Sequence, residues 1–253
     1  MRYLYHGISL QNKRPSNMDS LLLKCGTIGG GPALLALVCD GVGSMADGAF
    51  ASGEAARMLS EWFDAAGSAG ASGATDLTGA AGRVGLAMRD EVLRINKTII
   101  ARAKERGMDT ATTLSALLLA GSAYYIVHIG DSRIYCLDGG RLDGGRGDRG
   151  AGGQDQALSL LTHDDVSESG RLTACIGQTE ALFPQYAEGD GGEKTFLLCS
   201  DGLYKRIDHS IMISTMKNWS EKAMKEPVEA LAQYAVKQGE RDNITVALAR
   251  CIG

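Results

Sequence analysis

Residues 33–48 read ALLALVCDGVGSMADG, an apolar run that stops at Asp40 and continues into a glycine-rich loop with a second acid, Asp47. A run without polar residues is typical of a strand that is buried on both faces. Carboxylates are rarely buried unless they are paired or bind a metal ion. The same pattern recurs in TFLLCSDG, residues 195–202, where the apolar run is followed by Ser200, Asp201 and Gly202. Both stretches therefore place an acid where a buried strand ends.

The composition is that of a globular protein with a substantial core. The chain has 253 residues, of which 44% are hydrophobic and 22% charged, and its net charge is −4. The negative charge and the lack of a basic cluster argue against nucleic acid as a partner. No apolar stretch is long enough for a membrane span, and the first residues do not resemble a signal peptide, so we expect a cytoplasmic protein. No linker divides the sequence, which predicts one domain over residues 1–253.

The six cysteines are expected to be structural. None of them forms a Cys-x-x-Cys pair, which argues against a zinc ribbon or a thioredoxin-like site. Cys39, Cys199 and Cys251 lie in or at the end of apolar runs and are expected to be small buried hydrophobic residues. A nucleophilic cysteine is disfavoured because no histidine stands out as its partner.

Short apolar segments bounded by Gly, Asp or Ser predict strands, and longer segments with helical periodicity lie between them. The segment 113–138 predicts a meander of three antiparallel strands. Clustered strands with helices between them favour an α+β layered fold over βαβ repeats. The expected strands are 3–9, 20–25, 33–39, 113–120, 123–130, 133–138, 195–200 and 243–251, and the expected helices are 48–65, 83–106, 208–218 and 226–238.

Three further segments, 64–82, 138–157 and 188–194, are expected to be loops or turns because they are rich in glycine and polar residues. The second contains an Arg-Gly-Asp triplet at 146–148, which we interpret as a chance occurrence. Its spacing of acids fits neither an EF-hand nor a nonapeptide β-helix repeat, so a calcium-binding role is disfavoured.

Several aspartates stand at the ends of predicted strands or in adjacent turns. If they meet at one end of a sheet, their repulsion raises their pKa values, and divalent cations are the simplest remedy. Ligands made only of oxygen suit Mg²⁺ or Mn²⁺. Glycine after Asp40 leaves its backbone carbonyl accessible, so Gly41 is a further candidate ligand. Taken singly each acid also fits an ordinary turn, and Asp131 could simply pair with Arg133. The aspartates are Asp19, Asp40, Asp131, Asp201 and Asp242.

The order of the motifs resembles the PPM, or type 2C, family of metal-dependent Ser/Thr protein phosphatases in its short bacterial form. NKRPSNMDS resembles the family's opening Arg-x-x-Asn-x-Asp motif, and VCDGVGSMADGAFAS resembles its Asp-Gly-x-Gly motif before a helix. The segments MDTATTLSALLL, HIGDSRIY, LLTHDD, LTACIG, FLLCSDGLY and RDNITVALA follow in the family's order. Each motif alone is a weak signal, but together they cover nearly the whole chain.

The resemblance implies a four-layer αββα sandwich, in which two antiparallel sheets are flanked by helices. It also implies two Mg²⁺ or Mn²⁺ ions at one edge and allows a weak third ion. Asp40 is expected to bridge the two ions, and the Gly41 carbonyl to bind one of them. Asp201 and Asp242 are expected to bind the other.

The resemblance assigns roles to four further positions. Asp19 is expected in or just behind the metal shell. Asp131, with Asp201, matches the third-ion position of bacterial members. Arg14 matches the residue that clamps the substrate phosphate, and Asn243 is expected to orient the aspartate before it.

The implied activity is hydrolysis of phosphoserine and phosphothreonine by direct attack of a hydroxide that bridges the two ions. The implied partners are phosphoproteins, among them a Ser/Thr kinase and its substrates. The alternative is a catalytically weak module of the same fold that binds or regulates phosphoproteins. Such modules usually lose metal ligands, whereas Asp40, Asp201 and Asp242 are all present, which favours the enzyme.

Two departures from the family pattern concern catalysis and substrate access. Val42 stands where many members carry a histidine proposed as general acid, and His6 and His163 are expected to be structural or on the surface. Only residues 167–171 separate THDDV from LTACIG, so the flap beside the catalytic cleft is nearly deleted. We therefore expect a more open cleft, altered substrate selection and a weakened third ion. Smaller departures are Asp165, Val166 and Ala174.

Overall fold

The computed structural model describes residues 1–43, 45, 47–71, 81–138, 158–217 and 224–252. The strands are β1 (Arg2–Leu10), β2 (Ser20–Ile28), β3 (Gly31–Cys39), β4 (Leu114–Ala120), β5 (Ala123–Ile129), β6 (Arg133–Leu137), β7 (Leu158–Leu160), β8 (Gln185–Asp190), β9 (Thr195–Cys199) and β10 (Ile244–Ile252). The helices are α1 (Gly48–Ala71), α2 (Ala81–Glu105), α3 (Asp201–Tyr204), α4 (His209–Lys217) and α5 (Lys225–Lys237).

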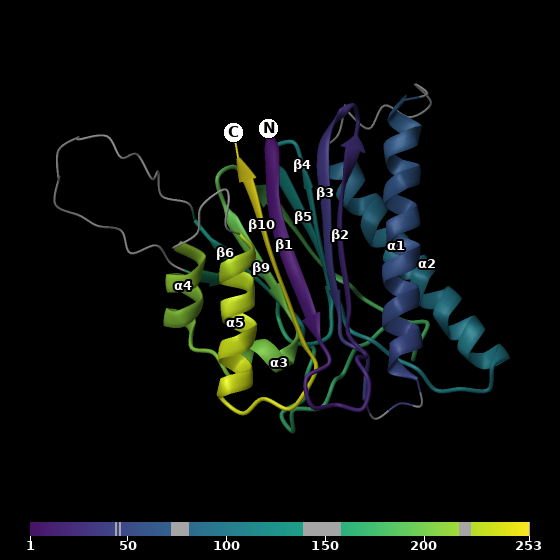
Figure 1. Ribbon diagram of the computed structural model, residues 1–253. Helices are drawn as coiled ribbons and strands as arrows, with labels where there is room; N and C mark the ends of the chain where they lie inside the picture. Colours follow the sequence, from purple (N-terminus) through teal and green to yellow (C-terminus); the bar gives the residue numbers. More distant parts are fainter. Residues whose placement is uncertain (44, 46, 72–80, 139–157, 218–223, 253) are drawn as a thin grey trace.

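The described strands form two five-stranded antiparallel sheets, which lie between two layers of helices (Figure 1). One sheet has the strand order β2-β3-β4-β5-β8 and is covered by α1 and α2. The other has the order β1-β10-β9-β6-β7 and is covered by α4 and α5. This is the αββα sandwich that the sequence predicted.

The apolar run in β3 is explained by burial on both faces. Leu35 and Leu37 pack against the helices, while Leu34 and Val38 pack against the second sheet. Alternate side chains of a strand point to opposite faces, so a strand between two apolar layers needs no polar residue. Burying each such side chain stabilises the fold by roughly 2 kcal/mol.

The helices bury one face each, as their periodicity predicted. On α2, Val84, Met88, Val92, Ile95 and Ile99 recur every three or four residues, and all are buried in the cluster beneath α1. On α5 the buried residues recur in the same way and pack toward β10. In the part of the chain that the structure describes, no helix is both long and apolar enough to span a membrane.

The predicted meander is wrong at its third strand. β4 and β5 pair with each other, but β6 pairs with β7 and β9 in the other sheet. The chain crosses between the sheets at Gly130, whose φ of 103° favours glycine. A Cβ at this position would also lie 2.6 Å from the side chain of Thr113. Apolar periodicity identifies a strand but not its partner, so the sequence did not reveal this crossing.

Two of the predicted loops, 64–82 and 188–194, include parts of a helix or a strand. The first loop was expected to start at residue 64, but α1 continues to Ala71, and a Cβ at Gly67 would lie 2.6 Å from the carbonyl oxygen of Thr27. This glycine allows close packing of helix on strand and does not end the helix. The predicted turn at 188–194 includes the end of β8, and only its later residues turn. The segment 139–157, with its Arg-Gly-Asp triplet, lies outside the described residues.

All six cysteines are free thiols, and five of them, including Cys39, Cys199 and Cys251, are buried as expected. Cys25 is exposed. The short elements β7 and α3 were not predicted, because three or four residues carry too little periodicity to identify them.

Candidate active site

The predicted site residues converge at one edge of the sandwich, where β1 and β3 end and β2 and β10 begin (Figure 1). A pocket of about 140 Å³ opens there. Its lining includes most of the predicted set, and the two exceptions, Asp19 and Asn243, lie immediately behind it. The lining residues are Arg14, Met18, Asp40, Gly41, Val42, Gly43, Thr113, Asp131, Leu172, Asp201 and Asp242.

Asp40 is held by the loop that precedes β4. Its backbone N–H donates to Thr113 Oγ1 at 2.9 Å, and its carbonyl accepts from the Thr113 N–H at 2.9 Å and from Thr112 Oγ1 at 3.0 Å. Thr113 Oγ1 also lies 2.8 Å from Ser132 Oγ, next to Asp131. The two threonines were part of a quoted motif, but the sequence did not reveal that they fix Asp40.

Gly41 is glycine because the backbone packs tightly around it. A Cβ here would lie 2.6 Å from the carbonyl oxygens of Met18 and Gly48. The Gly41 N–H donates to the Met18 carbonyl at 3.2 Å, which joins the loop before β2 to the end of β3. Close packing, in addition to the expected accessibility of its carbonyl, therefore explains the Asp-Gly pair.

The central carboxylates destabilise one another. Burial raises the pKa of Asp40 well above its usual value, and the charges of Asp19, Asp201 and Asp131 raise it further. The pKa of Asp19 is raised to about 6, chiefly by burial. Burial and the charge of Asp201 raise the pKa of Asp131 to about 6. Unfavourable charge therefore concentrates at the ends of β3 and β5.

Asp19 leaves one buried oxygen unpaired. Its Oδ2 accepts from Thr245 Oγ1 at 2.6 Å, whereas Oδ1 is buried and has no hydrogen-bond partner. An unpaired buried carboxylate oxygen is costly, so its retention indicates a ligand. Among the described residues, no three acidic, histidine or cysteine side chains are arranged to enclose an ion directly. The donor set nevertheless suits divalent cations, which would satisfy this oxygen and offset the mutual repulsion.

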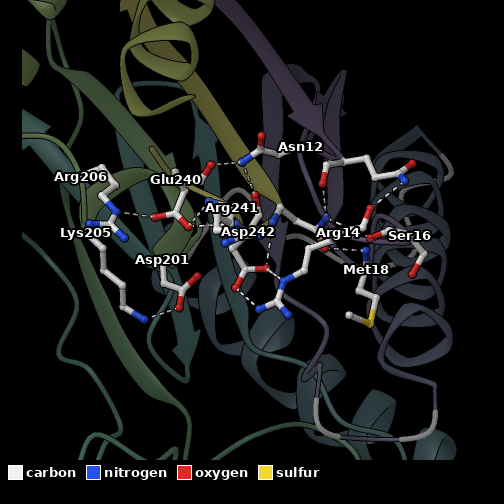
Figure 2. A network of polar contacts seen from close by, with 12 residues as sticks. Asn12, Arg14, Ser16, Met18, Asp201, Lys205, Arg206, Glu240, Arg241 and Asp242 are labelled. Atoms are coloured by element: carbon white, nitrogen blue, oxygen red, sulfur yellow. Dashed lines mark hydrogen bonds and ion pairs between the residues drawn. The ribbon is translucent and has the colours of Figure 1, made fainter. Parts of the chain in front are cut away.

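Asp242 forms an ion pair with Arg14 (Figure 2). Arg14 Nε donates to Asp242 Oδ1 at 2.6 Å, and Nη2 donates to Oδ2 at 2.5 Å. Burial raises the pKa of Asp242, but the hydrogen bonds from Arg14 and from the Asn243 N–H outweigh it, so the pKa lies below its usual value. Arg14, which is expected to bind the substrate phosphate, thus lines the pocket and is paired with Asp242, a predicted metal ligand.

Asn243 organises the segment that carries Arg14. Its backbone N–H donates to Asp242 Oδ1 at 2.9 Å, which fits the expected orienting role. Its side chain donates to the carbonyls of Gln11 and Ser16 at 2.8 and 3.0 Å and accepts from the Met18 N–H at 2.9 Å. This buried amide therefore holds the whole loop between β1 and β2.

Glu240 and Asn12 complete this side of the site, and neither was predicted (Figure 2). Glu240 Oε1 accepts from the backbone N–H groups of Arg241 and Asp242 at 2.7 and 2.9 Å. Asn12, with a φ of 51°, donates to the carbonyls of Glu240 and Asp242 at 2.8 and 2.9 Å. The only sequence signal was a polar cluster before β10.

Lys205 is a further unpredicted residue of the site. Its Nζ forms an ion pair with Asp201 Oδ2, and the two residues are four apart across the turn of α3 (Figure 2). Burial lowers the pKa of Lys205, but the hydrogen bond to Asp201 and the charges of Asp201 and Asp131 outweigh it and raise the pKa. In the sequence this pair is visible only as the spacing within DGLYK, and one turn is too short to predict the helix that brings the two residues together.

The structure excludes the alternative in which Asp131 pairs with Arg133. Arg133 Nε and Nη2 donate instead to Asp164 at 2.9 and 2.7 Å, and its guanidinium lies 3.7 Å from the centre of the Tyr204 ring. Asp131 faces the pocket. Of the histidines considered, His163 is exposed and His6 lies within β1, and neither lines the pocket.

The segment where the sequence predicts a nearly deleted flap is a tight turn. Val166 and Leu172 pair as an antiparallel bridge, and the Ser167 N–H donates to the Arg171 carbonyl at 2.8 Å. Leu172 is the residue of this turn that lines the pocket. Asp165 accepts from the Gly130 N–H at 2.9 Å and so ties the turn to the crossing that carries Asp131.

A larger pocket of about 690 Å³ lies at the end of α2. Its lining includes Met45, Ile100, Lys104, Met108 and a single acid, Asp109. A lone exposed carboxylate does not create the repulsion seen at the smaller pocket. The chemistry of the residues, and not the size of the pocket, therefore identifies the candidate active site.

Comparison with known families decides the relationship. A family model described as protein phosphatase 2C matches residues 16–239. This chain belongs to the protein phosphatase 2C family. The resemblance seen in the motifs is thereby confirmed, and the match includes Asp19, Asp40, Asp131 and Asp201.

Curated relatives of this phosphatase 2C chain are bacterial and human. It is 28% identical to the serine/threonine phosphatase stp of Listeria welshimeri over 226 residues, which are 85% of this chain and 83% of that protein. It is also 28% identical to the serine/threonine protein phosphatase PstP of Mycobacterium tuberculosis over 187 residues. That match covers 65% of this chain but 32% of PstP, so the chain spans about a third of that relative.

Solved structures share the phosphatase 2C fold. The catalytic domain of PstP, crystallised with two manganese ions, has a TM-score of 0.74 and 24% identity, and 99% of each chain is covered. Stp1 from Staphylococcus aureus has a TM-score of 0.79 and 18% identity, over 100% of this chain and 96% of that one. These likenesses confirm the αββα sandwich.

Proposed function

We propose that this chain is a metal-dependent protein serine/threonine phosphatase that acts on phosphoserine and phosphothreonine. The observation that carries the proposal is the convergence of four aspartates and Arg14 at one pocket, with Asp19 behind it and one buried Asp19 oxygen left unpaired. Membership of the phosphatase 2C family supports it. Phosphoproteins are the proposed substrates, with a Ser/Thr kinase as functional counterpart in the cytoplasm.

The carboxylates of Asp40, Asp201 and Asp242, with the Gly41 carbonyl, would hold a pair of Mg²⁺ or Mn²⁺ ions. Asp19 would lie behind them and meet the ions directly or through water. When bound, such a pair lowers the pKa of a water molecule and stabilises negative charge on a phosphoryl group. Neither a cysteine nor a serine nucleophile is needed for this chemistry.

The chain's own residues supply position and charge. The backbone of Asp40 is held by hydrogen bonds with Thr112 and Thr113, which places its side chain at the pocket. The Arg14 guanidinium lines the pocket, and its planar fork matches two phosphoryl oxygens as well as it matches Asp242. In this proposal the Arg14 guanidinium exchanges its hydrogen bonds to Asp242 for hydrogen bonds to the substrate phosphoryl group, and the Asp242 carboxylate would then be available to hold a metal ion.

The leaving serine or threonine oxygen needs a proton. No histidine lines the pocket among the described residues, and Val42 occupies the position where a histidine general acid was considered. We assign this proton to solvent, which would enter the pocket beside the short turn at 167–171. A slower reaction with poor leaving groups is the expected consequence.

The experiment that tests the proposal is hydrolysis of a phosphothreonine peptide by the purified protein, with Mn²⁺ and with excess chelator. Asp201→Asn is the site variant, and Asp90→Asn is the matched control, because Asp90 is 67% exposed on α2. Turnover should require metal, persist in the control and vanish in Asp201→Asn. A wild-type protein that binds Mn²⁺ but gives no turnover would instead favour a module that only binds phosphoproteins.

A further inference from the structure

We infer that Lys205 is a built-in cation of the acidic cluster, and that its ammonium group takes the place a third divalent ion would otherwise have beside Asp201 and Asp131. The inference rests on the proposed function, because it concerns the metal content of the same site. It replaces the expectation of a weak third ion with a side chain of this chain.

The position of Lys205 is fixed by the backbone. Its N–H donates to the Asp201 carbonyl at 3.2 Å, which closes the single turn of α3 and brings the lysine side chain over the aspartate (Figure 2). This turn is closely packed, because Leu203 is fully buried and a Cβ at Gly202 would lie 2.1 Å from the Asn243 carbonyl oxygen. The ammonium group therefore stays within reach of Asp201.

The charge of Lys205 also acts on carboxylates other than that of Asp201. Its charge lowers the pKa of Asp131, which burial and Asp201 raise, and it also acts on Asp242. Arg133, close to Asp131 in sequence, is engaged by Asp164 and Tyr204 instead. Lys205 is thus a cation that compensates the Asp131 side of the cluster.

The two cations of the site are placed differently. Arg14 lines the pocket, where a phosphoryl group would lie, whereas Lys205 does not. A divalent ion between Asp131 and Asp201 would have to approach an ammonium group that already contacts Asp201. Like charges at such short range repel strongly when the shared carboxylate is largely buried, and the Asp201 side chain is only 19% exposed.

An ordinary helix-surface pair provides the matched control. Lys225 and Glu229 have the same spacing on α5, with Nζ and Oε1 3.5 Å apart, but the Glu229 side chain is 47% exposed. An exposed pair of this kind is screened by water, and neither of its residues lines the pocket or is a predicted metal ligand. Removing Lys225 should therefore leave metal binding unchanged.

The test counts bound Mn²⁺ ions on protein stripped with chelator, by calorimetric titration and by the electron paramagnetic resonance signal of free Mn²⁺. Wild type, Lys205→Arg and Lys225→Met should each bind two ions at saturation. Lys205→Met should bind three. The double variant Lys205→Met/Asp131→Asn should return to two, because the extra ion needs Asp131.

Circular dichroism and thermal unfolding first show that each variant is folded, which is expected because the Lys205 side chain is 55% exposed. Three bound ions in the wild type, or two in a folded Lys205→Met variant, would overturn the inference. A wild type that binds no Mn²⁺ would overturn the proposed function as well. A wild-type protein that binds two ions but does not hydrolyse the phosphothreonine peptide would count against the proposed phosphatase function alone.

Discussion

The two sides of the site treat their carboxylates in opposite ways. On one side is a paired wall, made of Asn12, Arg14, Glu240, Asp242 and Asn243, in which every side chain has hydrogen-bond partners. The pKa values of its two acids, Asp242 and Glu240, lie below their usual values because hydrogen bonds outweigh burial.

Beside it is an acidic centre, made of Asp19, Asp40 and Asp131. Here burial and mutual repulsion raise all three pKa values, and an Asp19 oxygen has no partner. The wall contributes stability and orientation, whereas the centre costs stability and retains capacity to bind cations. The capacity to bind cations therefore lies where the fold leaves carboxylate charge uncompensated.

The largest expected effect comes from neutralising the middle of the acidic centre. Asp40→Asn should lower kcat/KM for a phosphothreonine peptide by at least about a thousandfold, because metal ions contribute several kcal/mol to such reactions. In chelator, the same variant should be more stable than wild type by roughly 1 kcal/mol, since it removes a repelled charge. A variant that is both active and destabilised would contradict the contrast between centre and wall.

The pH dependence of stability should reveal the acidic centre next. Asp19 and Asp131 have pKa values of about 6 in the folded protein against an ordinary 3.8, so the folded state binds more protons between these values. Stability in chelator should therefore be greatest at low pH within this window and fall as pH rises through 6. The loss is about 3 kcal/mol or less for each group.

Urea unfolding at pH 5 and pH 7.5 measures this slope. Mn²⁺ should restore stability at pH 7.5, and Asp131→Asn should flatten the slope. The acids of the wall act in the opposite direction, but only below about pH 4, where their carboxylates become protonated. Stability in chelator that rose from pH 5 to 7.5 would show that the central acids are compensated.

The wall should prove stabilising. Asn243→Ala removes three hydrogen bonds to the loop between β1 and β2, which should lower the free energy of unfolding by roughly 2 kcal/mol. KM should also rise, because Arg14 loses its support. Urea denaturation and steady-state kinetics measure the two effects, and a change in kcat alone would not fit a role in holding the loop.

A smaller loss of activity is expected when Arg14 is replaced by lysine, which keeps the positive charge but changes its shape. Arg14→Lys should lower kcat/KM by about tenfold, because an ammonium group cannot form the two parallel hydrogen bonds of guanidinium. Arg241→Lys, at an exposed neighbouring position, is the control. Equal activity of Arg14→Lys and wild type would show that charge alone is used.

The smallest effect should be at the turn between Val166 and Leu172. Ser167→Ala removes hydroxyl contacts to Ser169 and to the Arg171 N–H, both exposed. Unfolding free energy should change by less than about 0.5 kcal/mol, with kcat/KM unaffected. A loss comparable to that of Asn243→Ala would mean that this turn is a structural part of the site.

Much of the site was visible in the sequence because strand ends carry their own signal. Asp40 and Asp201 follow apolar runs typical of buried strands, Asp131 stands at another predicted strand end, Gly41 was named because it follows Asp40, and Arg14 was found through motif order. All of them line one pocket. The roles given to these residues stay predictions until metal binding and turnover are measured.

Other members of the site had no such signal. Lys205 belongs to a one-turn helix too short to show periodicity, and Glu240 and Asn12 meet only because β1 and β10 pair along their length. The same limit explains the misplaced β6, whose apolar pattern fits either sheet. Contacts between residues distant in sequence depend on strand partners, which local patterns do not specify.

The sequence by itself determined the buried strands, the helical faces, the family and the acids at the strand ends, because each follows from local periodicity or ordered short motifs. The tertiary structure alone decided which carboxylates are compensated and which are not. Arg14 reaches Asp242 across more than two hundred residues, Lys205 covers Asp201, and Asp19 is left with an unpaired oxygen. Charge compensation depends on distance in space and on burial, and both arise only when the two sheets pack together.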